Sequence, residues 1–275
     1  MKRKHFLKLA GLTSIASTAS ITGFATAPDR KQAVDLQLGL ASYTLRKLSL
    51  EDVIKTATRL NLKGIALKSM HMPLEASAEE TKAAAEKVRA AGLKLYGAGV
   101  IYMKTAQEVE AAFAYAKTAG LETIVGVPNH EFLPQVNELV KKYDIKLAIH
   151  NHGPGDNLYR SPNNVFDKIK DLDKRIGLCI DIGHVVRIGE DPIPMIKKYK
   201  DRLYDMHMKD VNKVAEDGTP LEIGRGVIDI PGVIGALKSI GYSNQVAIEY
   251  EKDGDDPVPG LCESVGYLRG IMKLS

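Results

Sequence analysis

The chain has 275 residues, with 38 lysines and arginines, 34 aspartates and glutamates, and only two cysteines. Four of the basic residues and none of the acidic ones lie in the first 27 positions, so the rest of the chain is neutral at 34 against 34. A neutral domain argues against a nucleic-acid partner, which usually needs a basic face, and gives no support to a heavily phosphorylated substrate.

Residues 1–27 have the composition of a cleaved export signal and are left out of the fold prediction. Four basic residues precede a weakly apolar stretch at 9–24, and Ala25, Thr26 and Ala27 form a small-residue cleavage site. The run at 3–8 resembles a twin-arginine signal with lysine as its second basic residue, and a Sec signal has nearly the same composition. No cysteine directly follows the apolar stretch, so we expect no stable membrane anchor. The sequence predicts a periplasmic protein with one domain at 28–275.

Short apolar runs alternate with amphipathic stretches eight times after the signal, as strands and helices do in α/β proteins. The expected strands lie at 37–42, 63–68, 94–99, 122–127, 145–150, 176–181, 203–208 and 245–250. Helix starts are marked by three capping boxes, in which a hydroxyl and an acidic side chain satisfy free backbone amides: Ser49 with Asp52, Ser77 with Glu80, and Thr105 with Glu108. Glycines at 92, 120 and 241 follow the ends of three helical patterns.

Eight repeats in about 248 residues predict an α/β protein closed into a (β/α)8 TIM barrel. The alternative is an open doubly wound sheet, which would place its ligand site at one switch point between two strands. Polar residues here recur at the ends of at least five strands, and this favours the barrel. The long connection at 211–229 follows the seventh strand and would lie over the mouth of such a barrel.

Two histidines and two carboxylates fall where four of the apolar runs end, so they should meet at one end of the barrel. They are His150, Asp181, His207 and Glu249. One such residue alone is about as often a structural hydrogen-bonding group as a ligand, but four of them from four strands predict a metal site. This set of nitrogen and oxygen donors suits one divalent ion, such as Mn, Co, Ni, Zn or Fe(II).

The segments around these residues resemble the sugar phosphate isomerase/epimerase superfamily, whose members have a xylose-isomerase-like barrel. The most specific segments are C-I-D-I-G-H at 179–184, H-M-K-D at 207–210, G-R-G-V-I-D at 224–229 and I-E-Y-E at 248–251. The resemblance covers nearly all of residues 28–275. It implies that Asp181, His207 and Glu249 bind the metal and that His184 binds the substrate.

The fifth strand departs from the family's pattern. The family generally has a glutamate at its end, where this chain has His150 in the segment I-H-N-H-G. A neutral imidazole in that place reduces the ligand charge from −3 to −2 and makes the ion a stronger Lewis acid. It also removes a carboxylate that epimerases of this type use as a base.

The chemistry implied by the resemblance is proton abstraction next to a ketone, through a metal-stabilised enediolate. Reprotonation gives an isomer or epimer, whereas a leaving group β to the ketone gives elimination. Exported relatives act on oxidised glycosides and expel the aglycone from 3-keto-glucosides, and the I-H-N-H-G segment is similar to theirs. We therefore expect a metal-dependent carbon–oxygen lyase, with a sugar isomerase or epimerase as the alternative.

Residues next to the ligands are the expected catalytic groups, because side chains two positions apart on a strand share a face. His152 is the expected base, and the alternative is a histidine that only supports the metal ligands. Lys209 is expected to stabilise the enolate oxygen, unless it only pairs with Asp210 or Glu251.

The sugar substrate is expected to contact Lys68, His71, Glu251 and Arg225. An inward lysine at a strand end, such as Lys68, is costly without a partner. His71 follows the same strand, Glu251 can hydrogen-bond sugar hydroxyls, and Arg225 lies in the long connection. The sequence has no glycine-rich nucleotide motif and no nucleophile elbow, so a small neutral sugar is the expected partner.

A non-catalytic sugar-binding protein on the same barrel is the hypothesis from another class. The chain has no tryptophan for stacking on sugar rings, although it has 11 tyrosines. Binding alone would need no metal, so a metal assay separates the two hypotheses. Cys179 should face the barrel interior and Cys262 the outside, so we expect no disulfide between them.

Overall fold

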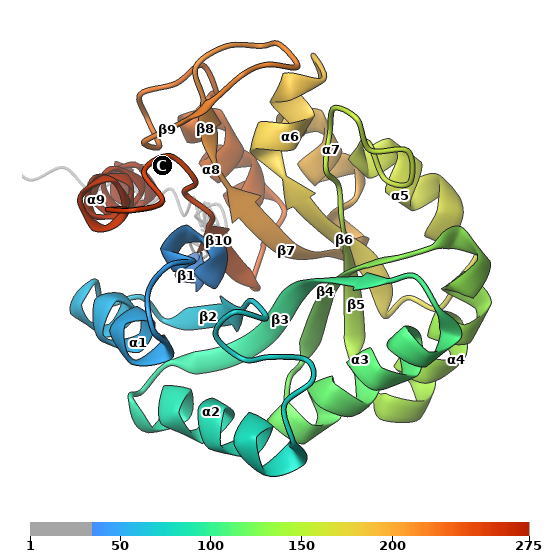
Figure 1. Ribbon diagram of the computed structural model, residues 1–275. Coiled ribbons are helices and arrows are strands. Elements are labelled where there is room, and N and C mark those ends of the chain that lie inside the picture. Colours follow the sequence, from blue (N-terminus) through green and yellow to red (C-terminus); the bar gives the residue numbers. More distant parts are fainter. Residues whose placement is uncertain (1–34, 275) are drawn as a thin grey trace, which may run out of the picture. The chain divides into compact units, whose positions relative to one another are not determined.

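The computed structural model describes residues 35–274, and the predicted export signal at 1–27 lies outside this part of the chain. Eight parallel strands of the described part form a closed barrel in the order β1-β10-β7-β6-β5-β4-β3-β2 (Figure 1). This confirms the predicted (β/α)8 barrel. The strands are β1 Gln37–Ala41, β2 Gly64–Leu67, β3 Lys94–Met103, β4 Thr123–Pro128, β5 Lys146–His150, β6 Ile176–Asp181, β7 Leu203–Met208 and β10 Gln245–Ile248.

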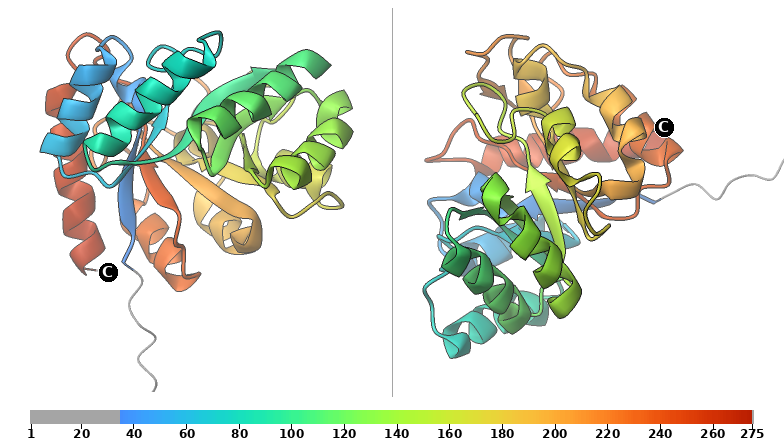
Figure 2. Two further views of the ribbon diagram at one scale, coloured as in Figure 1. Left: turned by 90° about the horizontal axis from the view of Figure 1, so that it is seen from below. Right: turned by 90° about the vertical axis from the view of Figure 1, so that its right-hand side faces the viewer.

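Helices surround the barrel, and the last helix, α9, lies beside the first, α1 (Figures 1 and 2). The α-helices are α1 Leu50–Arg59, α2 Ala78–Ala90, α3 Ala106–Ala119, α4 Leu133–Tyr143, α5 Pro162–Ile169, α6 Ile182–Arg187, α7 Pro192–Lys198, α8 Ile230–Ser239 and α9 Val258–Leu274. Short 3-10 helices are η1 Ser42–Leu45, η2 His130–Phe132 and η3 Lys200–Arg202. No helix within residues 35–274 is long and apolar enough to cross a membrane.

The helix boundaries follow the predicted capping signals closely. The capping boxes at the starts of α2 and α3 are complete. At α1, Ser49 accepts a hydrogen bond from the backbone N–H of Asp52, but the Asp52 carboxylate accepts from the Ser49 hydroxyl and not from its backbone amide. Aspartate is one methylene shorter than the glutamate that closes such a box. The glycines at 92, 120 and 241 have φ of 80°, 63° and 70°, the left-handed conformation that ends helices.

Strand β3 is longer than the predicted 94–99 and continues to Met103. Its second half pairs with β4, with Tyr102 opposite Val127. The predicted strand ended at Gly99, but the following V-I-Y-M is rich in residues that favour strands. The extension carries Tyr102 to the carboxyl end of the barrel.

Packed side chains fill the barrel interior, as in other closed α/β barrels. One interior cluster combines Tyr96 with three alanines, and a second combines Val125, Ala148 and Cys179. The main apolar core lies between the strands and the surrounding helices. Cys179 is buried and Cys262 is exposed, as predicted, and both are free cysteines.

The long connection after β7 is an ordered hairpin. Strands β8 Asp210–Val211 and β9 Pro220–Leu221 pair in antiparallel fashion. The buried carboxylate of Asp210 accepts hydrogen bonds from four backbone N–H groups, those of Val211, Gly224, Gly226 and Ile228. These bonds hold the connection against the end of β7.

Candidate metal centre and active site

Four side chains converge at the carboxyl end of the barrel, and each is at most 3% exposed. Ligand-type atoms from all four lie within 4.8 Å of one another. His150 Nε2 at the end of β5 lies 3.0 Å from His207 Nδ1 of β7 and 3.4 Å from Asp181 Oδ2 of β6. His207 Nδ1 lies 2.9 Å from Oε2 of Glu249, which directly follows β10. The structure therefore brings together all four residues predicted as metal ligands.

The protonation states at this cluster suit a metal ion. Burial lowers the pKa of His150 well below its usual value, so its imidazole is neutral at pH 7. Burial acts to raise the pKa of both carboxyl groups, but nearby positive groups, including Lys209, hold the pKa of Asp181 and Glu249 well below the usual range. Burial acts to lower the pKa of His207, but the Glu249 carboxylate outweighs burial, and the pKa lies above its usual value. Metal binding at this imidazole would therefore release a proton.

The ammonium of Lys209 compensates charge at the cluster. Its Nζ lies 3.0 Å from Asp181 Oδ2, 3.0 Å from Glu249 Oε2 and 2.9 Å from Glu251 Oε1. The lysine side chain is only 5% exposed, and buried charges persist only when they are paired in this way. Of the two predicted pairings, the one with Glu251 is present, whereas Asp210 is used by backbone amides.

These residues fit a divalent cation. Two ionised carboxylates within 3.9 Å of one buried imidazole are costly without cations to neutralise them. Two imidazole nitrogens and two carboxylates form a donor set that Zn, Mn, Co or Ni accepts. In a second possible ligand set, Cys179 joins His150 and His207 in place of the two carboxylates. Burial and the nearby Asp205 raise the pKa of that thiol well above its usual value, so Cys179 is protonated and a poor ligand.

His152 lies in the loop after β5, with its ring 4.4 Å from that of His150. Its Nδ1 lies 3.3 Å from Asp156 Oδ2, and its Nε2 lies 3.0 Å from the hydroxyl of Tyr102. Burial acts to raise the pKa of Asp156, but hydrogen bonds from His152 and from two backbone N–H groups lower it to about 2. The ionised Asp156 therefore holds a proton on Nδ1 of His152, and Nε2 carries the lone pair that accepts from Tyr102.

A close backbone contact fixes the loop that carries His152. Gly153 has φ +72°, and a Cβ at this position would lie 2.7 Å from the carbonyl oxygen of His184 in α6. Glycine is the residue that tolerates both the left-handed conformation and the close approach. The loop can therefore pack against α6 and keep the His152 ring beside the cluster.

A further carboxylate lies on the same strand as His207. Asp205 is fully buried, and its Oδ2 lies 3.8 Å from His207 Nε2. The hydroxyl of Tyr96 donates to the Asp205 carboxylate at 3.3 Å, and burial raises the pKa of Asp205 to about 6. The 3.8 Å separation is longer than a hydrogen bond, so Asp205 acts on the ring of His207 through its negative charge. Nδ1 of the same ring faces the ligand cluster.

Lys68, His184 and Glu251 border the cluster. Lys68 Nζ lies 3.9 Å from Glu249 Oε1 and 4.8 Å from the ring centroid of Tyr43. His184 Nε2 lies 3.8 Å from Asp181 Oδ2, and burial lowers the pKa of His184 to about 4, so its ring is neutral at pH 7. Glu251 is 28% exposed and can reach a ligand in the mouth of the barrel.

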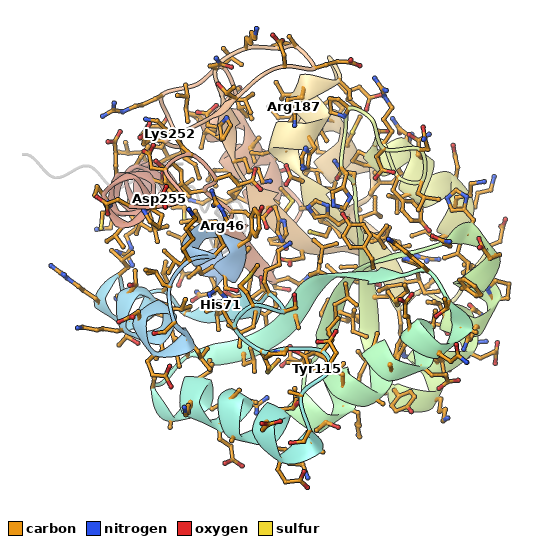
Figure 3. The ribbon with its side chains drawn as sticks, in the orientation of Figure 1. Arg46, His71, Tyr115, Arg187, Lys252 and Asp255 are labelled. Carbon is orange, nitrogen blue, oxygen red and sulfur yellow. The ribbon has the colours of Figure 1, made fainter. Side chains whose placement is uncertain are left out.

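His71 and Arg225 are not brought to the cluster. Both ring nitrogens of the buried His71 are used within the fold, Nδ1 by the Ser42 hydroxyl at 2.8 Å and Nε2 by the Leu45 carbonyl at 3.2 Å (Figure 3). Arg225 is exposed and forms a bidentate pair with Glu263 of α9. The sugar contacts predicted for these two residues would therefore require their present partners to be released.

Three residues of the site were not predicted from the sequence. Tyr102 was missed because β3 was expected to end at Gly99, although V-I-Y-M at 100–103 is rich in residues that favour strands. Asp205 stands two positions before His207 and shares its face, so the D-x-H spacing was a usable signal. Asp156 lies in an irregular loop where no periodic pattern indicates the direction of a side chain.

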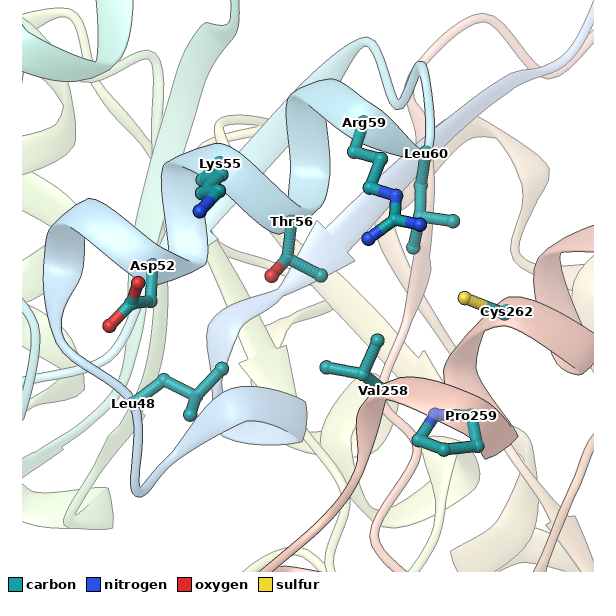
Figure 4. A pocket seen from close by; sticks show the side chains of 9 residues that line it. All are labelled: Leu48, Asp52, Lys55, Thr56, Arg59, Leu60, Val258, Pro259 and Cys262. Carbon is teal, nitrogen blue, oxygen red and sulfur yellow. The ribbon is translucent and has the colours of Figure 1, made fainter.

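An apolar groove of about 480 Å³ on the outside of the barrel is separate from this site (Figure 4). It lies between α1 and α9, and none of its lining residues belongs to the ligand cluster. The lining residues are Leu48, Asp52, Lys55, Thr56, Arg59, Leu60, Val258, Pro259 and Cys262.

A closed parallel barrel with a polar ligand cluster at the carboxyl ends of its strands is a TIM-barrel protein with its site in the usual place for that fold. The chain belongs to the xylose isomerase-like TIM barrel family, whose model matches residues 49–271. This confirms the family resemblance inferred from the strand-end segments.

Comparisons with individual proteins agree with this membership. The chain is 26% identical over 160 residues to an inosose dehydratase of Lacticaseibacillus casei. The match covers 52% of this chain and 53% of the relative, so the chain spans about half the length of that relative. A solved structure of the IOLI protein with a zinc atom has a TM-score of 0.69 at 17% identity, covering 86% of this chain and 96% of that one. The 3-keto-D-glucoside 4-epimerase of E. coli has a TM-score of 0.69 at 14% identity, covering 86% and 100%. These two structures share the fold.

Proposed function

We propose that this protein is a divalent-metal-dependent lyase that expels the aglycone from neutral 3-keto-glucosides by 1,2-elimination. The observation that carries the proposal is the pair of histidines at the end of β5 and just after it. His150 belongs to the ligand cluster, and His152 lies beside it with its own carboxylate partner, Asp156. One oriented base next to a Lewis-acid site is what elimination requires. Epimerisation at one carbon needs a base on each face.

His152 is the base in this proposal. Asp156 keeps Nδ1 protonated, so Nε2 is the nitrogen that accepts the proton from the carbon next to the ketone. The same carboxylate stabilises the imidazolium that forms. Asp156 is ionised at pH 7 because its pKa is about 2.

The ligand cluster supplies the electrostatic part of the reaction. A divalent ion held by His150, Asp181, His207 and Glu249 would provide Lewis-acid stabilisation for the negative charge that develops on the ketone oxygen. Lys209 adds a fixed positive charge next to Asp181 and Glu249. We assign sugar hydroxyl contacts to Lys68, Glu251 and His184, which border the cluster.

Two observations support a neutral glycoside as the substrate. Residues 28–275 have no net charge, and the predicted export signal leads us to propose a periplasmic location, where free glycosides are available. The similar inosose dehydratase is by its name also an eliminating enzyme, and the E. coli epimerase on the same fold acts on a 3-keto-glucoside. A kinetic preference for sugar phosphates over the unphosphorylated sugars would contradict this part of the proposal.

The direct test is incubation of the metal-loaded protein with 4-nitrophenyl 3-keto-glucoside. We expect release of nitrophenol with the 3-keto-glucoside and none with the matched 4-nitrophenyl glucoside, which has no ketone to acidify the α-proton. Chelation of the metal should abolish release. Failure to release the aglycone, together with metal-dependent interconversion of free ketoses, would indicate an isomerase or epimerase. Absence of bound metal and of any turnover would indicate a sugar-binding protein.

A further inference from the structure

We propose that Tyr102 is a second catalytic residue of this site, the acid that protonates the departing aglycone oxygen. The inference rests on the proposed elimination and extends it, because it names the group that acts on the leaving side of the reaction. Nothing in the family resemblance or the predicted ligand set indicated this tyrosine.

The geometry places Tyr102 where substrate can reach it. The end of β3 carries its side chain to the mouth of the barrel, where its hydroxyl lies 3.0 Å from His152 Nε2. The two rings are stacked, with centroids 5.6 Å apart and planes inclined by 29°. Tyr102 is 50% exposed, whereas the side chain of His152 is only 23% exposed. The phenol therefore forms the outer member of a chain that runs from Asp156 through His152.

The phenol is also in the protonated form that an acid needs. Burial, together with the negative charges of Asp156 and Glu249, raises the pKa of Tyr102 above its usual value. At neutral pH the hydroxyl therefore carries its proton. With the ring proton of His152 on Nδ1 towards Asp156, the hydroxyl is the donor in its hydrogen bond to Nε2.

The two groups together account for every proton in the elimination. When substrate binds, the Tyr102 hydroxyl turns to donate to the glycosidic oxygen, and this frees the Nε2 lone pair. The bond between the α-carbon and its hydrogen breaks, His152 takes the proton, and the electron pair forms a double bond to the neighbouring carbon. The bond from that carbon to the aglycone oxygen breaks, and the oxygen takes the Tyr102 proton.

The resulting tyrosinate then regains a proton from Nε2 of His152, and both side chains return to their initial states. The net result is the transfer of one proton from carbon to the aglycone oxygen. The hydrogen that is removed and the aglycone oxygen that is protonated are attached to neighbouring carbons of the substrate. Two protein groups 3.0 Å apart are therefore suitably spaced to serve both atoms.

The test uses aglycones of different basicity with Tyr102→Phe. Nitrophenolate is a weak base and leaves without help, so turnover of the 4-nitrophenyl 3-keto-glucoside should change little. The methyl 3-keto-glucoside has a strongly basic leaving oxygen, and its turnover should fall by about 10²-fold, the scale of a lost general acid. Tyr143→Phe at the end of α4, on the outside of the barrel, is the matched control and should affect neither substrate.

A second measurement separates the roles of the two residues. Tyr102→Phe should still exchange the substrate's α-proton with deuterated solvent, whereas His152→Ala should not. An equal loss of turnover with both aglycones, or loss of α-proton exchange in Tyr102→Phe, would show that the tyrosine only orients His152. If the wild-type protein releases no aglycone at all, the proposed lyase function fails and the inference fails with it. Thermal unfolding of each variant verifies that the fold is intact.

Discussion

The ammonium of Lys209 lies 3.0 Å from the Asp181 carboxylate, so one ligand of the candidate metal centre already has a buried cationic partner. Removing one member of a buried ion pair leaves an uncompensated charge. We expect Lys209→Met to lower the unfolding free energy of the metal-free protein by about 3–5 kcal/mol. A bound dication would replace part of the lost charge, so the metal-loaded protein should lose less.

Denaturant unfolding with and without metal measures this difference. The control is Lys213→Met, because Lys213 pairs with Asp217 on the surface, where such pairs contribute about 0–1 kcal/mol. Equal destabilisation of the metal-free and metal-loaded forms by Lys209→Met would contradict the expectation that a bound metal ion replaces part of the charge of Lys209.

One divalent ion should bind per chain through His150, Asp181, His207 and Glu249. Asp181→Ala and His207→Ala should each lose the metal, because each removes one of the four donors of the buried set. Elemental analysis of purified protein gives the stoichiometry. His130→Ala, in η2, should keep the ion. Full metal content and activity in the Asp181 and His207 variants would refute the site.

His152→Ala should lower turnover by about 10²-fold or more, the scale of a lost general base. Its metal content should not change, because His152 lies beside the ligand set and is not part of it. Turnover and metal content are measured on the same preparation. Loss of the ion together with activity would mean that His152 only supports the metal ligands.

Asp205→Asn should weaken metal binding by about 10–100-fold, because it removes the negative charge beside the outer nitrogen of His207. Competition with a chromogenic chelator measures the affinity directly and does not depend on turnover. Asp217→Asn, on the exposed connection after β7, is the control. Unchanged affinity in Asp205→Asn would mean that packing alone orients the ring.

Asp156 should make the fold sensitive to acid. Its pKa is lowered from 3.8 to about 2, so its contribution to stability is fully present above pH 3.8 and is lost as the pH falls towards 2. The unfolding free energy of the wild type should therefore decrease more steeply over this interval than that of Asp156→Asn. Parallel curves for the two proteins would show that the Asp156 carboxylate is not stabilised by its neighbours.

The ligand set was predictable because strands of a parallel barrel end at one level, so ends of apolar runs in the sequence become neighbours in space. His150 and Asp181 illustrate this, since 30 residues separate them in the chain and 3.4 Å separates their side chains. The same logic failed for His71, because a residue just beyond a strand end can turn into the fold and be used by local hydrogen bonds. Arg225 was predicted from its place in the long connection and not from a strand end, and its partner Glu263 lies on a helix that strand patterns do not position.

Tyr102 and Asp156 show a different limit. The predicted strand ended at Gly99, although the pairing of β3 with β4 continues to Met103. Asp156 reaches His152 only because the loop turns back on itself, and composition does not reveal such a turn. The groups that orient the base were therefore less predictable than the metal ligands.

The strand pair that closes the barrel, β1 with β10, also brings the two ends of the described chain together. Residues 35–38 and Arg269, Met272 and Lys273 line one groove at the amino-terminal end of the barrel. This end is opposite the mouth where the ligand cluster lies. A tether or fusion partner joined at either end of the described chain should leave the mouth open. A short linker between these two chain ends should allow circular permutation without breaking a strand pair.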